Sequence, residues 1–114
     1  MKRCFELARA SNDAGDSAFG ACIVCNGTLV AEAQNTSQTD ITGHAEINAI
    51  RTACAKYPDL DLGACTLYSN LEPCAMCSFL IRDLGIGRVV FAHSSPHLGG
   101  FSRWDILTDT ALDD

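Results

Sequence analysis

The chain has 114 residues, of which 47% are hydrophobic and 19% charged, and its net charge is −6. This composition is that of one ordinary globular domain over residues 1–114, and it excludes a disordered chain. Apolar runs such as residues 18–25 fall far short of the ~18 residues that a membrane helix needs, and the eight basic residues are scattered along the chain. We therefore expect neither a membrane nor a nucleic acid as partner.

Seven cysteines are an odd number, and the first ten residues are charged and amphipathic rather than a continuous apolar secretion signal. These features favour a reducing, cytoplasmic location. In such a compartment, clustered cysteines more often bind metal or serve catalysis than form disulfides.

The predicted elements begin with a helix over residues 1–11, where apolar residues recur at helical spacing. Two runs of strand type flank Asn26-Gly27, which predicts a hairpin over residues 18–35. The later elements alternate: a helix over 44–57, a strand over 64–71, a helix over 72–86, a strand over 87–94, a loop over 95–104 and a short helix with an acidic end over 105–114. The order αββαβαβ favours an α/β fold, a three-layer α/β/α sandwich with a mixed central sheet.

Cys74 and Cys77 form a Cys-x-x-Cys pair at the start of a predicted helix. Such a pair can be a redox couple, half of a structural zinc site or part of a catalytic zinc site. Residues three apart share one face of a helical turn, and a helix N-terminus favours thiolates. His44 begins the preceding helix, and three protein ligands would leave a fourth zinc position open for water.

Two alternatives use the same cysteines. Cys22 and Cys25 make a second Cys-x-x-Cys pair, so a four-cysteine structural site is conceivable, but residues three apart in a strand point to opposite faces. The other cysteines are most simply small buried hydrophobic residues. A redox role is disfavoured because no thioredoxin-like context surrounds the pair.

Glu46 lies two residues after His44, too close to be a comfortable fourth ligand. Its carboxylate is close enough to reach a metal-bound water and accept a proton from it. A structural zinc site would have no use for such a carboxylate.

The "HAE" of residues 44–46 followed by "PCAMC" resembles the zinc-dependent nucleobase and nucleoside deaminases of the cytidine deaminase-like superfamily, whose signature is H-x-E…P-C-x-x-C. The resemblance covers residues 1–107. Within that superfamily, "AFGACIV", "TLYSNLEPCAMC" and "IGRVVFAHS" are most similar to guanine deaminases and bacterial tRNA adenosine deaminases.

The resemblance implies that His44, Cys74 and Cys77 bind zinc and that Glu46 is the catalytic proton carrier. It implies a hydrolytic reaction in which water replaces an amino group on a ring carbon and ammonia leaves. It also implies a homodimer.

Five residues are candidates for substrate binding. The resemblance implies that the Ala45 N–H bonds a ring carbonyl and that the Asn35 amide contacts the base, although Asn35 could simply order the polar loop of residues 36–43. His93 is a candidate pocket wall or an ordinary loop residue. Phe101 and Trp104 could stack a planar base or pack in the core, where we also expect Phe19.

We expect the substrate to be a small aminated heterocycle, guanine-like first and cytosine-like next. A tRNA-editing adenosine deaminase is the main alternative and a non-catalytic zinc-stabilised module the third. "SRWDIL" resembles the tRNA-editing branch, but the acidic residues after it disfavour RNA. Relatives usually continue with a further strand and helix, which we expect to be absent here.

Overall fold

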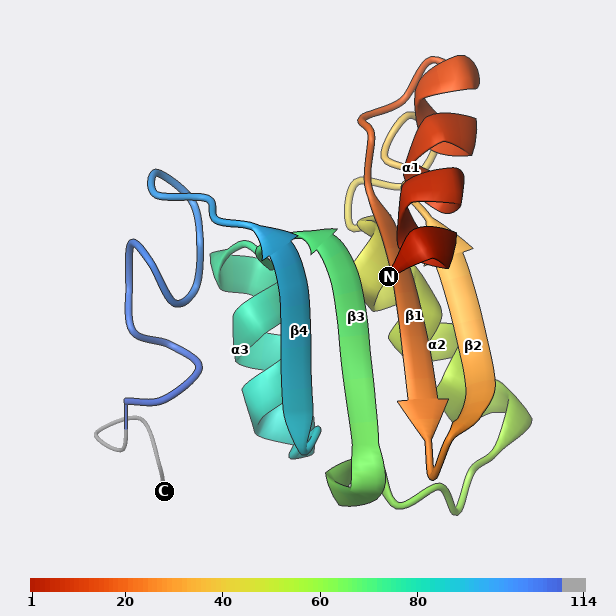
Figure 1. The fold of residues 1–114 in the computed structure, drawn as a ribbon, viewed down its shortest axis with the longest axis vertical. Helices are drawn as coiled ribbons and strands as arrows, with labels where there is room; N and C mark the ends of the chain where they lie inside the picture. The colour runs from red at the N-terminus through yellow and green to blue at the C-terminus, as the bar shows by residue number, and fades with distance from the viewer. Residues whose placement is uncertain (110–114) are drawn as a thin grey trace.

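The computed structural model describes residues 1–109, and its elements follow the predicted order (Figure 1). The helices are α1 (Lys2–Asp13), α2 (Ala45–Lys56) and α3 (Ala75–Leu84), with a short 3₁₀ turn, η1 (Leu62–Ala64), before the third strand. The strands are β1 (Gly20–Cys25), β2 (Thr28–Gln34), β3 (Cys65–Leu71) and β4 (Arg88–His93).

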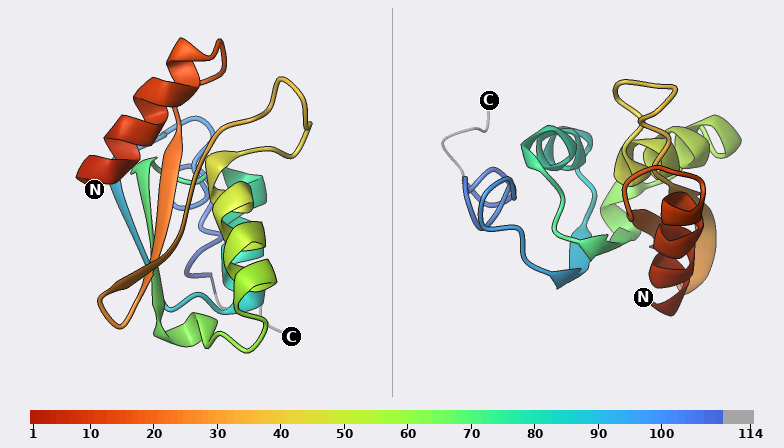
Figure 2. Two further views of the ribbon diagram at one scale, coloured as in Figure 1. Left: turned by 90° about the vertical axis from the view of Figure 1, so that its right-hand side faces the viewer. Right: turned by 90° about the horizontal axis from the view of Figure 1, so that it is seen from above.

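The four strands form one mixed sheet in the order β2-β1-β3-β4. β1 runs antiparallel to β2 and β3, whereas β3 and β4 are parallel. α1 lies on one face of the sheet, and α2 and α3 lie on the other (Figure 2). The predicted three-layer α/β/α sandwich with a mixed sheet is therefore confirmed.

The predicted hairpin turn lies between β1 and β2. Asn26 and Gly27 both have positive φ angles, 51° and 79°. Two such residues match the twist of the flanking strands, which is why Asn-Gly is favoured in two-residue hairpin turns.

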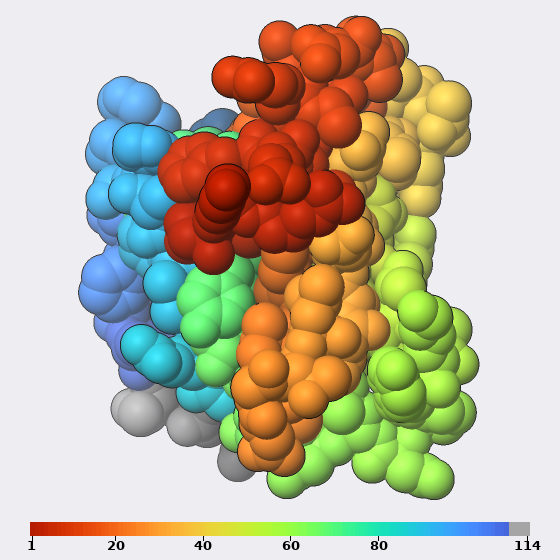
Figure 3. All heavy atoms as spheres, turned by 45° about the vertical axis from the view of Figure 1, so that its right-hand side comes forward, coloured from red at the N-terminus to blue at the C-terminus, as the bar shows by residue number. Residues whose placement is uncertain are grey.

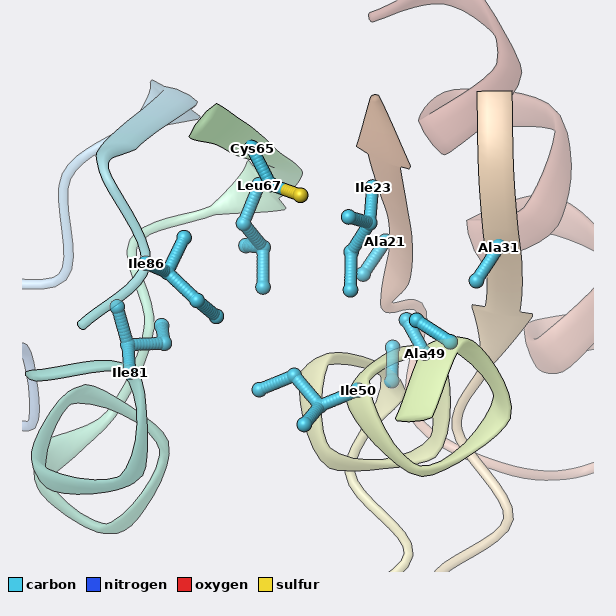
Figure 4. Packing of buried hydrophobic residues seen from close by; sticks show 11 residues of the cluster. Ala21, Ile23, Ala31, Ala49, Ile50, Cys65, Leu67, Ile81 and Ile86 are labelled. Carbon is cyan, nitrogen blue, oxygen red and sulfur yellow. The ribbon is translucent and has the colours of Figure 1, made fainter. Parts of the chain in front are cut away.

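The larger core lies between the sheet and the two helices that carry the candidate site. Ala21 and Ile23 of β1 and Leu67 of β3 point toward Ile50 of α2 and Ile81 of α3 (Figure 4). Alternate residues of a strand face opposite sides of the sheet, so these strands contribute every second residue to this core. Packing against one sheet fixes α2 and α3 relative to each other.

A smaller core lies under α1. Cys4 and Leu7 pack on Cys22 of β1, with Tyr68 of β3 at its border. α1 approaches closely because Gly20 lacks a side chain: a Cβ there would lie 2.7 Å from the Cβ of Leu7. In the space-filling view, α1 lies across one part of this face and leaves the strands below it visible (Figure 3).

Three local predictions were wrong. α3 begins at Ala75 rather than at residue 72, because Cys74 keeps an extended backbone as the N-cap and Pro73 lies before it. Residues 105–109 form turns instead of a helix, and the rest of that predicted helix lies outside the described residues. Cys54 is exposed, since the inner face of α2 is formed by residues such as Ile50.

Candidate metal centre and cavity

His44, Cys74 and Cys77 lie together beside the start of two helices. The Sγ atoms of Cys74 and Cys77 are each 3.5 Å from Nδ1 of His44, and the three ligand atoms lie within 4.8 Å of one another. Among residues 1–109, this is the one group of His, Cys, Asp or Glu side chains close enough to share a metal ion. The three predicted ligands are thus brought together.

The distances fit a tetrahedral zinc ion. Zinc binds sulfur at ~2.3 Å and nitrogen at ~2.0–2.1 Å, so in a tetrahedral site a sulfur ligand and a nitrogen ligand lie about 3.6 Å apart. The observed 3.5 Å agrees for both pairs. A soft donor set of two thiols and one imidazole also suits zinc. Three protein ligands would leave one coordination position for water or substrate.

Helix N-termini position all three donors. His44 is the N-cap of α2 and Cys74 the N-cap of α3, both with extended backbones, and Cys77 lies in the first turn of α3. A hydrogen bond from the Cys77 thiol lowers the pKa of Cys74 to about 5. The same bond, together with burial, raises the pKa of Cys77. Both cysteines would bind a metal ion as thiolates.

Glu46 is buried, with 5% of its surface exposed, in the first turn of α2. Burial raises the pKa of its carboxyl, and the nearby Cys74 charge adds to the increase. A carboxyl group with a raised pKa can take up and release a proton nearer to neutral pH than an exposed glutamate can. Glu46 lies outside the group of three metal donors, as expected for a proton carrier.

A cavity of about 140 Å³ opens beside these residues. The candidate site contributes His44, Glu46 and Cys74 to its lining, and Phe19 forms part of its apolar wall. The remaining lining residues come from the end of β3 and from the loop after β4: Leu71, Glu72, Ser95 and Leu98. Phe19 both borders the core and reaches the cavity, so the core role expected for it was incomplete.

Glu72 is the charged cavity residue that sequence reasoning missed, along with Leu71, Ser95 and Leu98. It is 2% exposed and accepts hydrogen bonds from the backbone N–H groups of Ser95, Phe101 and Ser102. Burial alone would raise the pKa of Glu72, but the bonds from Ser102, Ser95 and Phe101 outweigh it and lower that pKa. The available signal was the position of this charged residue, directly before Pro73 and the metal cysteines. A carboxylate that is buried there must find hydrogen-bond donors in the surrounding chain.

Asn35 and Ala45, both predicted to contact substrate, are bonded to each other. The backbone N–H of Ala45 donates to Oδ1 of buried Asn35 at 2.8 Å. The Asn35 amide nitrogen donates to Asp16 and Ser37. The pair thus fixes the start of α2 beside His44.

His93, Phe101 and Trp104 lie outside the residues that line the cavity. The exposed His93 ring packs edge-on against Phe5 of α1, with 6.2 Å between ring centroids. Phe101 lines a separate hollow beside β4, and Trp104 is half-exposed with the Arg103 guanidinium 5.6 Å from its ring centre. None of the three lines this cavity, and their contact with substrate stays a prediction.

The second cysteine pair does not join the metal group. Cys22 packs with Cys4 under α1, whereas Cys25 borders the core on the opposite face of the sheet. The expected opposite orientation of the two side chains is confirmed, and it removes the basis for a four-cysteine site.

The model of one protein family, the cytidine and deoxycytidylate deaminase zinc-binding region, matches residues 1–93. The chain is 35% identical over 115 residues to the tRNA-specific adenosine deaminase of Aquifex aeolicus, a match that covers 98% of this chain and 76% of that protein. It is 45% identical over 80 residues to the guanine deaminase of Bacillus subtilis, covering 68% of this chain. The latter match spans about half of the relative, 51%.

A similar fold is present in a solved structure from a study of A-to-I editing by tRNA:A34 deaminases at the wobble position. That chain superposes with a TM-score of 0.84 at 32% identity, and the match covers 88% of this chain and 78% of the other.

Proposed function

Because this chain belongs to the family of the cytidine and deoxycytidylate deaminase zinc-binding region, we propose that it deaminates a small aminated nucleobase, guanine-like purines first. The chain is a zinc-dependent enzyme that hydrolyses C–N bonds. The observation that carries the proposal is the convergence of His44, Cys74 and Cys77 beside buried Glu46 at one small cavity.

His44, Cys74 and Cys77 would hold the zinc. When bound, the ion supplies a Lewis acid that lowers the pKa of a coordinated water toward neutrality. The two cysteines bind as thiolates, and their negative charge moderates that effect, so a carboxylate that accepts the water proton is useful.

Glu46 is the carboxylate suited to this role. Among the described residues, two glutamates line the cavity, and both oxygens of Glu72 are already engaged by the loop after β4. Glu46 instead interacts with Cys74, Cys77 and His44. Deamination replaces a ring C–N bond by a C–O bond and moves protons from water to the ring and to the departing amine. Glu46 would accept and return those protons.

The charge of the chain supports a small substrate, because a net charge of −6 does not attract phosphates. The cavity of about 140 Å³ has the size for one base, whether free or turned out of a polynucleotide. The test is ammonia release by the zinc-loaded chain from a panel containing guanine, cytosine, adenine and their nucleosides. Release from guanine is expected, and no release from any member of the panel would refute the proposal.

The alternative substrate is adenosine in tRNA. It is favoured by similarity to a tRNA-specific adenosine deaminase over 98% of the chain. This function would require retention of an anticodon stem-loop that weakens as salt rises, with a slope set by the number of phosphate contacts. Absence of such retention at low salt would leave the free-base proposal.

We also propose that the chain is a cytoplasmic homodimer. Met76 and Phe79, one turn apart on α3, are both more than 40% exposed and offer an apolar surface for a second copy. Light scattering at several protein concentrations tests the dimer.

None of the helices in residues 1–109 is long and apolar enough to cross a membrane.

A further inference from the structure

We propose that Glu72 is a positioning residue for substrate binding: its carboxylate holds the 95–102 loop against the start of α3, and this loop forms one wall of the cavity. The choice of guanine as substrate in this inference rests on the proposed function. The claim that Glu72 holds the loop in place does not depend on it.

The hydrogen bonds to Glu72 reach across the loop. Oε1 accepts from the N–H of Ser95 at 3.1 Å and from the Ser102 hydroxyl. Oε2 accepts from the N–H groups of Phe101 and Ser102 at 3.0 and 2.8 Å. One buried side chain therefore ties the two ends of an eight-residue segment, 95–102, to the turn that precedes Cys74.

Close backbone packing completes this attachment. A Cβ at Gly99 would lie 1.8 Å from Oε2 of Glu72, so the carboxylate occupies the space that a side chain there would need. The loop also bonds the start of α3 directly: the Ala75 N–H donates to the Leu98 carbonyl at 3.1 Å, and the Gly100 N–H donates to the Pro73 carbonyl at 2.9 Å.

The held loop faces the reacting groups. Ser95 and Leu98 line the same cavity as His44 and Glu46. A loop that shifts moves this wall, whereas His44 and Cys77 are held at the starts of α2 and α3. Cys74 pairs with Gly99 of the loop, so zinc content is measured together with activity. Loss of the Glu72 contacts should therefore weaken substrate binding more than it slows the chemical step.

A carboxylate is specifically suited to this position. Its oxygens accept three backbone N–H groups, and glutamine would replace one oxygen by an NH₂ donor facing another donor. The substitution Glu72→Gln changes neither the size nor the shape of the side chain. It therefore removes the negative charge and one acceptor oxygen while the packing of the side chain is kept.

The experiment compares zinc-loaded wild type, Glu72→Gln and Gly99→Ala, with Glu6→Gln on the exposed face of α1 as the matched control. Two quantities are measured: KM and kcat for ammonia release from guanine, and backbone amide exchange across the chain. Gly99→Ala disturbs the same contact by steric collision and leaves the carboxylate present.

We expect both variants to keep one zinc per chain, to raise KM about tenfold with kcat changed less than about threefold, and to speed exchange at Phe101 and Ser102. The control should match wild type. Unchanged exchange in the loop of both variants would overturn the proposal, as would a fall in kcat at constant KM. If wild type does not deaminate guanine, that substrate assignment fails, and the exchange result still decides whether Glu72 positions the loop.

Discussion

The side-chain oxygen of Asn35 accepts a hydrogen bond from the backbone N–H of Ala45, at 2.8 Å, where β2 ends and α2 begins. Ala45 directly follows the metal-ligand candidate His44, and both Asn35 and Ala45 are buried. The bond satisfies one of the N–H groups that a helix N-terminus leaves without an intrahelical partner. It therefore links the polar loop to the orientation of the candidate site, whatever contact either residue makes with substrate.

Replacing Asn35 by alanine should destabilise the protein by about 1–3 kcal/mol, because it leaves the buried Ala45 N–H without its acceptor. Gln38→Ala, at an exposed position of the same loop, is the control and should cost less. Urea denaturation of the zinc-loaded variants measures the free energy of unfolding. Equal losses for both substitutions would contradict this role of the Asn35 oxygen.

Replacing Glu46 by glutamine should lower kcat by about 10²–10⁴-fold, the contribution typical of a positioned general acid–base group. Zinc content should stay at one per chain, because Glu46 lies outside the group of three metal donors. Steady-state ammonia release and metal analysis of the same samples measure the two effects. Glu32→Gln, on β2 and paired with Arg3, is the control. Normal turnover by Glu46→Gln would eliminate the proposed proton carrier.

Replacing Cys74 or Cys77 by serine should abolish stoichiometric zinc binding. Zinc that binds only the folded chain stabilises it by about 2.7 kcal/mol at a free concentration one hundred times its Kd, so the variants should lose this zinc-dependent gain. Chemical denaturation with and without a chelator measures the loss. The matched control is Cys54→Ser, because Cys54 is exposed and outside the group of metal donors. The assignment would be refuted if a chelator lowered the free energy of unfolding of the Cys74→Ser and Cys77→Ser variants as much as it lowers that of wild type.

The fold and the metal donors were predictable because their signals are local. Asn26-Gly27 specifies its own hairpin turn, and a Cys-x-x-Cys at a helix start places two thiols on one face whatever surrounds it. His44 could be added since it also begins a helix. Each of these predictions depends on a few neighbouring residues and on regular backbone geometry.

The walls of the cavity were not predictable in the same way. The directions of the Phe101 and Trp104 side chains depend on the path of the loop after β4. That path is fixed by contacts with Glu72, a residue distant in sequence, which packs against Gly99. The His93 ring contacts Phe5 of α1, which lies at the other end of the chain. An irregular segment has no periodicity from which its side-chain directions can be read.

Acid should weaken the protein partly through Asp16, which accepts hydrogen bonds from the Ser37 hydroxyl at 2.6 Å and the Gln38 N–H at 3.0 Å. The bond from Ser37 is the largest cause that lowers the pKa of Asp16, from its ordinary 3.8 to about 2. Because the folded state holds the proton less tightly than the unfolded state, this stabilisation is present above pH 4 and disappears as pH falls toward 2.

Asp16→Asn removes this titration. The difference in free energy of unfolding between wild type and Asp16→Asn should therefore be constant above pH 5 and shrink between about pH 4 and pH 2. Urea denaturation of both proteins across that range measures it, and taking the difference cancels groups that titrate alike in the two. A difference that stays constant down to pH 2 would show that the Ser37 and Gln38 contacts do not favour the ionised carboxylate.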